Sequence, residues 1–248
     1  MTISPLGDSA IIVDFADEVS DQDRLLARAL AAAQALESAR IPGVVDITSA
    51  YQSVAVFFDL ARIQRDPPVE EKVYSTIGGS NRRRSIHTRV IEIPVCYDEE
   101  FALDLKRVVS HTSLTPDAIA VLHSSAEYTV ACIGFVPGFP FLAGLSEKLR
   151  VPRLETPRTK VPQGSVAIAN AQAGIYPFES PGGWNVIGRT PLLLFRPNEN
   201  PPAFLQSGNR VRFRRMRREE FEAKENDDAK IDRPTLSEAM GSKCGSLD

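Results

Sequence analysis

Several features that would assign a function class directly are scarce or missing in this chain of 248 residues. Its three cysteines and three histidines include no C-x-x-C pair, so neither a disulfide framework nor zinc-ligand spacing is present. No basic segment followed by a long apolar run opens the chain, and no apolar run approaches the ~18 residues of a membrane span. The net charge of −3 disfavours a general attraction to nucleic acid or anionic membranes. We therefore expect a cytoplasmic protein without a metal site.

One segment resembles a nucleotide-binding motif. From Gly183 to Thr190 the chain reads G-x-x-x-x-G-R-T, one residue away from a phosphate-binding P-loop. A P-loop opens a helix, whereas Pro191 and a short apolar run without helical periodicity follow here. Arginine also does not reproduce the point charge of the P-loop lysine. The sequence therefore predicts no nucleotide site at this position.

The first 80 residues alternate strand and helix patterns. The expected elements follow in the order 9–15 (strand), 21–40 (helix), 44–50 (strand), 53–59 (strand) and 68–77 (helix). Ser20 and Asp23 resemble a capping box at the start of the first helix. This order predicts a small α+β domain over residues 1–80, with its helices on one face of an antiparallel sheet.

Residues 81–88 are polar and rich in arginine, which predicts a linker before a second domain over residues 89–218. That domain is expected to open with a strand and two helices, at 90–95, 98–110 and 115–125. Short β-type runs separated by Pro/Gly turns follow, at 128–135, 165–170, 174–178, 184–190, 192–195 and 210–216. Such spacing predicts a mainly-β barrel or sandwich.

Two further expectations concern the end of the chain. In the last of these runs, arginine alternates with apolar residues, which indicates an edge strand with a solvated face. Residues 219–248 are charged and poor in large apolar side chains. They predict a disordered tail after a short helical continuation.

Proline, glycine, aromatic residues and arginine concentrate between Gly134 and Thr190, with Arg153 and Arg158 in proline-rich turns. Exposed aromatic and arginine side chains on stiff loops are typical of binding sites. The alternative is that these loops only turn the corners of a barrel whose core Trp184 and the phenylalanines fill. Composition leaves both open, and it assigns no catalytic residue, because no histidine can be placed beside Ser165.

Five stretches carry a resemblance to a known family: GDSAIIVDF, IPGVVDITSAYQSVAVFFD, GFVPGFPFLAGL, VPRLETPRTKVPQGSVAIAN and GIYPFESPGGWNVIGRTPLLLF. They resemble the B subunit of bacterial 5-oxoprolinase, a family also named allophanate hydrolase subunit 1 that includes KipI-type inhibitors. The resemblance spans residues 3–218 and implies an α+β N-terminal domain followed by a mainly-β, cyclophilin-like barrel domain. One departure is YDEEFALDL at 97–105, where the family has a glycine-rich turn.

The resemblance also implies an activity. With a companion C subunit, which is allophanate hydrolase subunit 2-like, and an A subunit, such a protein opens the lactam of 5-oxo-L-proline to L-glutamate using ATP. Because no ATP motif is visible, we expect ATP mainly on another subunit, and no activity from this chain alone. Two alternatives stay open: a KipI-like inhibitor of a sensor histidine kinase, and the carboxyltransferase component of a biotin-dependent, urea carboxylase-type enzyme.

The same stretches supply the expected substrate-binding residues. Arg158 and Arg189 are expected to contact carboxylate and phosphate charge. Gln163 and Ser165 are expected to hydrogen-bond the amide. Three aromatic side chains are expected to wall the pocket, namely Phe139, Tyr176 and Trp184.

Overall fold

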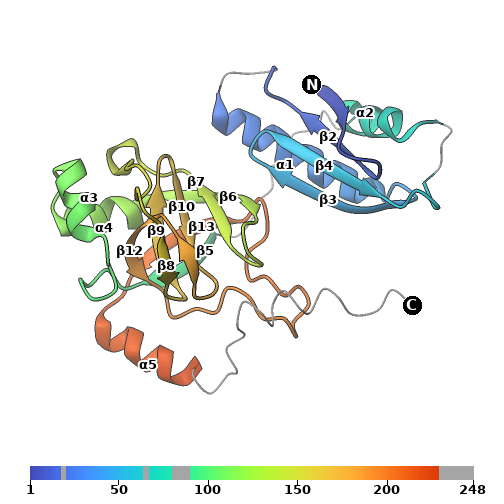
Figure 1. Cartoon of the computed structure of the whole chain (residues 1–248). Coiled ribbons are helices and arrows are strands. Elements are labelled where there is room, and N and C mark those ends of the chain that lie inside the picture. The colour runs from blue at the N-terminus through green and yellow to red at the C-terminus, as the bar shows by residue number, and fades with distance from the viewer. Residues whose placement is uncertain (18–20, 64–66, 80–89, 229–248) are drawn as a thin grey trace. The chain divides into compact units, whose positions relative to one another are not determined.

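The computed structural model describes residues 1–17, 21–63, 67–79 and 90–228. The chain divides into two compact units, Met1–His87 and Thr88–Asp248 (Figure 1). The expected linker at 81–88 and most of the expected tail lie outside the described residues, and so does Ser20.

In the N-terminal unit, the described residues form a four-stranded antiparallel sheet in the order β1-β2-β4-β3 and two helices. Its elements are β1 (Thr2–Pro5), β2 (Ala10–Asp14), α1 (Gln22–Ala39), β3 (Val44–Ala50), β4 (Ser53–Phe58) and α2 (Val69–Gly79). Leu36 of α1 and Val73 of α2 belong to one buried cluster with Val13, Val54 and Val56 of the sheet. Both helices therefore bury their apolar stripes against the same strands.

The start of α1 differs from the sequence expectation by one residue. The N-cap is Asp21, whose Oδ1 accepts hydrogen bonds from the backbone N–H of Asp23 and Arg24. An aspartate satisfies these orphan donors as well as a serine does, so the pattern located the cap region but chose the wrong residue. Strand β1 was not expected from the sequence, because it is short and mostly exposed.

The described residues of the C-terminal unit form a seven-stranded sheet, a two-stranded β8–β11 ribbon and three α-helices. Its elements are β5 (Val90–Val95), α3 (Leu105–Thr112), α4 (Pro116–Ser125), β6 (Glu127–Ile133), β7 (Pro140–Ala143), the 3-10 helix η1 (Glu147–Leu149), β8 (Arg158–Val161), β9 (Ser165–Ala169), β10 (Gln172–Ile175), β11 (Ser180–Gly182), β12 (Asn185–Arg189), β13 (Arg210–Arg215) and α5 (Arg218–Asp228). The large sheet has the order β12-β9-β10-β7-β6-β13-β5, in which only the β13–β5 pair is parallel.

Three sequence expectations for this unit are wrong. Strand β13 is not an edge strand, because β5 pairs with it on the outside. The expected alternation is present, since its exposed arginines alternate with buried Val211 and Phe213. Residues 98–104 form turns, and α3 begins only at Leu105. The apolar run 192–195 is largely buried but forms no strand, only an isolated bridge between Phe195 and Ala203.

The large sheet curls until residues at its two edges meet. Cys96, directly after β5, exchanges two backbone hydrogen bonds with Arg189 at the end of β12, each 2.9 Å from N to O. A Cβ on Gly188 would lie 2.7 Å from the Cys96 carbonyl oxygen, so only glycine permits this approach. The result is a curled, barrel-like sheet in a mixed α/β unit.

His123, near the end of α4, is fully buried. Its Nδ1 lies 2.7 Å from the Tyr97 hydroxyl oxygen, and its ring stacks on Phe213 at 4.3 Å between centroids. The Tyr128 hydroxyl donates to the His123 carbonyl oxygen. Burial lowers the pKa of His123 to about 3 and raises the pKa of both tyrosines.

This burial predicts an acid-sensitive stability. Between pH 7 and 5 the unfolded state protonates His123 and the folded state does not, so the free energy of unfolding falls as pH falls. The loss is about 2 kcal/mol over that interval for a pKa lowered from 6.5 to about 3. Urea unfolding of wild type and His123→Asn at both pH values measures it.

The His123→Asn variant should lose most of this pH dependence. An equal fall in both proteins would contradict the assignment. If the variant does not fold, an NMR titration of wild-type His123 that showed a shift between pH 7 and 5 would contradict it as well.

Candidate functional site

The three aromatic side chains expected as pocket walls do come together. The Phe139 ring lies edge-to-face against Tyr176 at 5.2 Å and against Trp184 at 5.6 Å, measured between centroids. All three side chains are buried and form one cluster with Val161 and Val186. Their rings therefore pack against one another instead of standing open to solvent.

Small residues on the sheet make room for this aromatic cluster. In β9, Val166 and Ile168 pack on one face of the sheet, while Ala167 and Ala169 face the aromatic rings. In β10, a Cβ on Gly174 would lie 2.7 Å from Phe139 Cζ. Both faces of these strands are buried, so side-chain size alternates along them and polarity does not.

One aromatic ring of the group is exposed. Phe135 is 63% exposed and adopts a left-handed backbone conformation with φ of 66°. Its ring stands edge-on to Phe139 at 5.6 Å, and Gly134 and Phe139 close the turn through a backbone hydrogen bond of 3.1 Å. The segment thus holds an exposed ring rigidly over the buried cluster.

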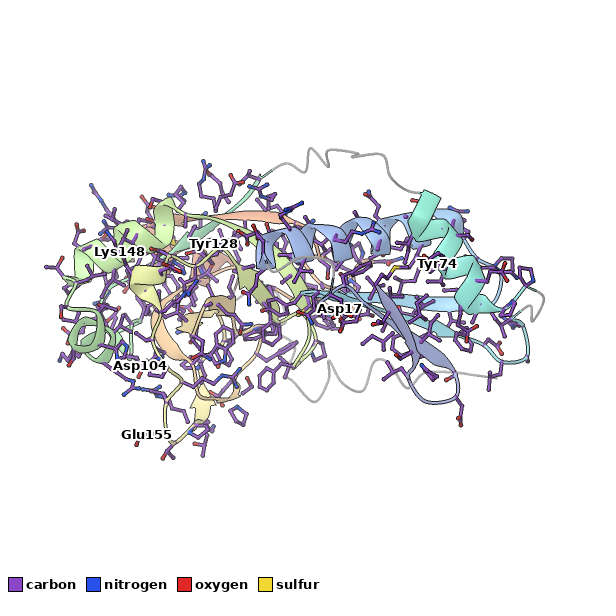
Figure 2. The ribbon with its side chains drawn as sticks, turned by 90° about the horizontal axis from the view of Figure 1, so that it is seen from above. Asp17, Tyr74, Asp104, Tyr128, Lys148 and Glu155 are labelled. Carbon is purple, nitrogen blue, oxygen red and sulfur yellow. The ribbon has the colours of Figure 1, made fainter. Side chains whose placement is uncertain are left out.

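Arg158 at the rim of the cluster is held by a buried carboxylate. Its two terminal nitrogens lie 2.8 and 2.6 Å from the two oxygens of Asp104, which is only 5% exposed. Asp104 Oδ2 also accepts the backbone N–H of Val186 at 2.8 Å. The pair ties the turn before α3, where Figure 2 labels Asp104, to both β8 and β12. The pair uses two of the five N–H groups of Arg158, whose side chain is 31% exposed, so an anion would share this guanidinium with Asp104.

A second buried polar group lies beside this pair. Asn185 is fully buried, and its Nδ2 donates to the carbonyl oxygens of Pro152 at 2.9 Å and Ile168 at 3.2 Å. Its Oδ1 accepts a hydrogen bond of 3.0 Å from Nε of the exposed Arg107. Two of these hydrogen bonds fix the positions of Arg107 and the loop at 151–157 relative to β12, and the third joins β12 to β9.

The loop at 151–157 places another cation on the aromatic cluster. The guanidinium carbon of exposed Arg153 lies 5.8 Å from the Trp184 ring centroid, and Leu154 N–H donates to Gly183 O at 2.7 Å. Burial raises the pKa of the Tyr176 hydroxyl, and the charges that act on it are Arg153, Arg158 and Asp104. Those three charges therefore gather around one hydroxyl group.

The other expected residues lie at the opposite end of β12. Arg189 Nε donates to Gln163 O at 2.8 Å, and Gln163 Nε2 donates to Pro177 O. Ser165, which is buried, pairs with Arg189 in the ladder. Arg189 also lies 3.5 Å from the Glu225 carboxylate of α5. Four residues of strand, about 13 Å, separate Asn185 from Arg189.

The seven expected residues therefore form two groups, one at each end of β12. Sequence reasoning missed the residues that position the group at the Asn185 end. Asp104, Arg107 and Asn185 were not expected because their partners lie 54 or 78 residues away in the chain. No local signal could have singled out Asp104, because it falls inside the helix expected over 98–110 and its side chain forms no cap hydrogen bond in the structure.

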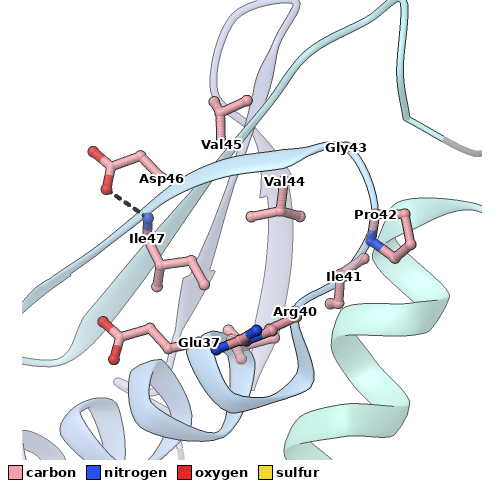
Figure 3. Close-up of a pocket in the computed structure, with 10 residues that line it drawn as sticks. Glu37, Arg40, Ile41, Pro42, Gly43, Val44, Val45, Asp46 and Ile47 are labelled. Carbon is pink, nitrogen blue, oxygen red and sulfur yellow. Dashed lines mark hydrogen bonds between the residues drawn. The ribbon is translucent and has the colours of Figure 1, made fainter.

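A separate hollow of about 490 Å³ lies in the N-terminal unit, at the junction of α1 and β3 (Figure 3). Glu37, Arg40 and Asp46 line it together with apolar side chains. Burial and then the charge of Asp46 raise the pKa of Glu37. No expected site residue lines this hollow.

Two features are absent from the part of the chain that the structure describes. It contains no group of three or more His, Cys, Asp or Glu residues arranged to hold a metal ion. Within the same residues, no helix has the length and apolar character needed to cross a bilayer.

Comparison with known proteins shows similarity over most of the chain. The profile described as "Carboxyltransferase domain, subdomain C and D" matches residues 1–205. The Bacillus subtilis protein named as the B subunit of 5-oxoprolinase is 38% identical over 230 residues, which cover 89% of this chain and 95% of that protein.

Two solved structures are also similar. A structure titled TTHA0988 has a TM-score of 0.73 at 38% identity and covers 84% of this chain but only 40% of that longer chain. The Kluyveromyces lactis urea amidolyase has a TM-score of 0.70 at 19% identity, with 89% of this chain and 15% of that chain covered. At that identity the second likeness shows the fold alone.

Asp104→Asn should destabilise the protein by about 2–3 kcal/mol, because it leaves Arg158 facing an amide instead of a carboxylate. This lies below the range for fully buried pairs, since the Arg158 side chain is 31% exposed. The control Glu99→Gln breaks the exposed 2.6 Å pair with Lys106 and should cost clearly less than Asp104→Asn, because solvent screens that pair. Chemical denaturation measures both, and equal costs would contradict the role of Asp104.

Gly174→Ala should cost about 1–3 kcal/mol, because the new methyl group overlaps Phe139 and Trp184. Gly78→Ala in α2 is the matched control, since a methyl group added there would meet no atom within 4 Å and alanine favours the helix. Thermal and urea unfolding compare them. A Gly174→Ala protein as stable as wild type would contradict the packing described for the aromatic cluster.

Proposed function

Because the chain belongs to the family of 5-oxoprolinase B subunits, within the carboxyltransferase-domain class, we propose that it is the B subunit of an ATP-dependent 5-oxoprolinase complex. Such a complex opens the lactam of 5-oxo-L-proline to L-glutamate. The observation that carries the proposal is the 38% identity to a protein of this name over 95% of that protein's length.

The finer fold assignment is part of the same proposal. We infer that the C-terminal unit is a cyclophilin-like barrel following an α+β N-terminal domain. The curled seven-stranded sheet and the bridge between Cys96 and Arg189 support it, because a barrel needs its two edges to meet.

The reaction needs cationic groups and a shaped, dry site. A lactam amide is a poor electrophile, so phosphorylation of its oxygen by ATP would create a leaving group, and arginines would stabilise the charge. Both proposed anion contacts already have partners: Arg189 lies 3.5 Å from the Glu225 carboxylate and donates from Nε to Gln163 O, and Arg158 pairs with Asp104. Both arginine side chains are partly exposed, so a ligand anion would share or exchange these contacts.

The remaining proposed binding roles follow the two ends of β12. Gln163 and Ser165 lie beside Arg189 and are proposed to recognise the amide. At the other end of β12, the residues proposed to form the pocket wall belong to the buried aromatic cluster. They are Phe139, Tyr176 and Trp184.

Other parts of the proposal concern other chains. We propose companion C and A subunits as partners, and a cytoplasmic location. ATP is proposed to bind mainly on another subunit, since Pro191 ends the P-loop-like pattern without a helix. This chain alone is then expected to be inactive.

A second candidate function has one supporting observation. The matching family description names a carboxyltransferase domain, which favours a component of a biotin-dependent carboxyltransferase. A biotin-carrier partner and carboxyl transfer to urea would identify that function. Nothing among the described residues favours the KipI-like inhibitor over these two.

Co-expression with candidate A and C subunits should give a complex that forms glutamate from 5-oxoproline only when ATP is present. Arg189→Ala should lower kcat/KM at least about tenfold, because one charge-assisted contact is lost. Arg212→Ala is the control, since this exposed β13 arginine pairs with Glu127. Size-exclusion chromatography of each variant reports assembly.

Two results would count against the proposal. An assembled wild-type complex without activity would refute the oxoprolinase function. Full activity of an assembled Arg189→Ala complex would refute only the anion-contact role.

A further inference from the structure

Two exposed arginines at the Asn185 end of β12 have no carboxylate partner among the residues that the structure describes. Within those residues, neither Arg107 nor Arg153 forms an ion pair. Neighbouring cations do: Lys106 pairs with Glu99, and Arg150 pairs with Glu147. Arg107 and Arg153 are therefore two cations at this end of the unit that no carboxylate among the described residues compensates.

Arg107 is held by a single buried anchor. Asn185, which is fully buried, accepts a hydrogen bond from Arg107 Nε and leaves the terminal nitrogens of that guanidinium outside the contact. A buried amide whose other hydrogen bonds go to Pro152 and Ile168 cannot turn away easily. The arginine is thus oriented before any ligand arrives, which lowers the entropic cost of binding.

Arg153 is held by a different kind of contact, although it directly follows Pro152, whose carbonyl Asn185 binds. Its guanidinium lies over the Trp184 ring, a contact that uses the face of the ring and none of the N–H groups of arginine. Because Asn185 binds the carbonyl of Pro152, the same side chain positions the loop that carries Arg153. One buried asparagine therefore sets the place of both arginines.

The surrounding charges favour a singly charged anion. Arg158 and Asp104 neutralise each other beside Asn185, and Glu155 stands at the outer tip of the loop in Figure 2. The local excess is then one to two positive charges. A carboxylate, with one negative charge, matches this excess more closely than a dianionic phosphate does.

We propose that Arg107 and Arg153 form a binding site for the carboxylate of a small ligand. Where the ligand is named as 5-oxoproline, this rests on the proposed function; the carboxylate site itself does not. Asn185 and Trp184 act as positioning residues, since each holds one of the two guanidinium groups in place.

The experiment titrates the full-length chain separately with 5-oxoproline, acetate and inorganic phosphate. Trp184 is the one tryptophan of the sequence, so its fluorescence reports on Arg153 directly, and calorimetry gives the affinity. Saturable binding of the carboxylates is expected. Arg107→Gln and Arg153→Gln should each weaken 5-oxoproline binding at least about tenfold, as expected for one charge-assisted hydrogen bond.

Arg150→Gln is the matched control, because it removes one positive charge at the start of the same loop from a side chain that already pairs with Glu147. It should change binding less than about twofold. Unchanged near-ultraviolet circular dichroism in all three variants shows that the fold is kept. Asn185 and Trp184 are left intact, since their removal would disturb the core.

Each other outcome overturns the proposal. No saturable binding of any probe, wild-type affinity in both arginine variants, or an equal loss in Arg150→Gln would do so. Phosphate binding tighter than both carboxylates would overturn the carboxylate assignment.

Failure of the site is distinguishable from failure of the proposed function. Binding of 5-oxoproline by this chain, with no glutamate formed by the assembled complex, would leave the site and remove the function. An active complex whose KM for 5-oxoproline is unchanged by Arg107→Gln and Arg153→Gln would support the function and refute the site.

Discussion

Two backbone hydrogen bonds between Cys96 and Arg189 are the constraint on which the C-terminal unit depends. They join one edge strand of the large sheet to the chain directly after the other, and Gly188 is the residue that allows the approach. Closure fixes β12 along the seam, so that Arg189 lies at the bridge and Asn185 at the far end of the strand. Helix α5 then covers the bridge by packing the buried Phe221 near Cys96.

Burial on both sides of the strands explains the unusual composition of this region. Strands whose two faces are both covered cannot alternate apolar and polar residues, so they alternate large and small ones. Alanine and glycine on one face leave space for the rings of Phe139, Tyr176 and Trp184. Two polar side chains in this interior, Asp104 and Asn185, each form several hydrogen bonds. In both cases one partner is an arginine side chain.

Local patterns in the sequence predicted local structure well. The strands at 44–50 and 90–95 and the helix expected at 115–125 are where turn chemistry and periodicity placed them, because each depends on neighbours within a few residues. The prediction that β13 is an edge strand was wrong, because strand order is set by contacts between residues far apart in the chain. For the same reason the Asp104–Arg158 pair was missed, and with it the residues that position Arg107 and Arg153. The glycine-rich motifs indicated where the region lies but not which arginines remain uncompensated.

The central claim is that this chain itself binds part of the substrate, at the arginine-bearing end of β12. A structure of the assembled complex with 5-oxoproline bound tests it most directly. The predicted result places the ligand carboxylate at hydrogen-bonding distance, about 3 Å, from terminal nitrogens of Arg107 or Arg153. A substrate held entirely by the other subunits, with both guanidinium groups facing solvent, would contradict the claim.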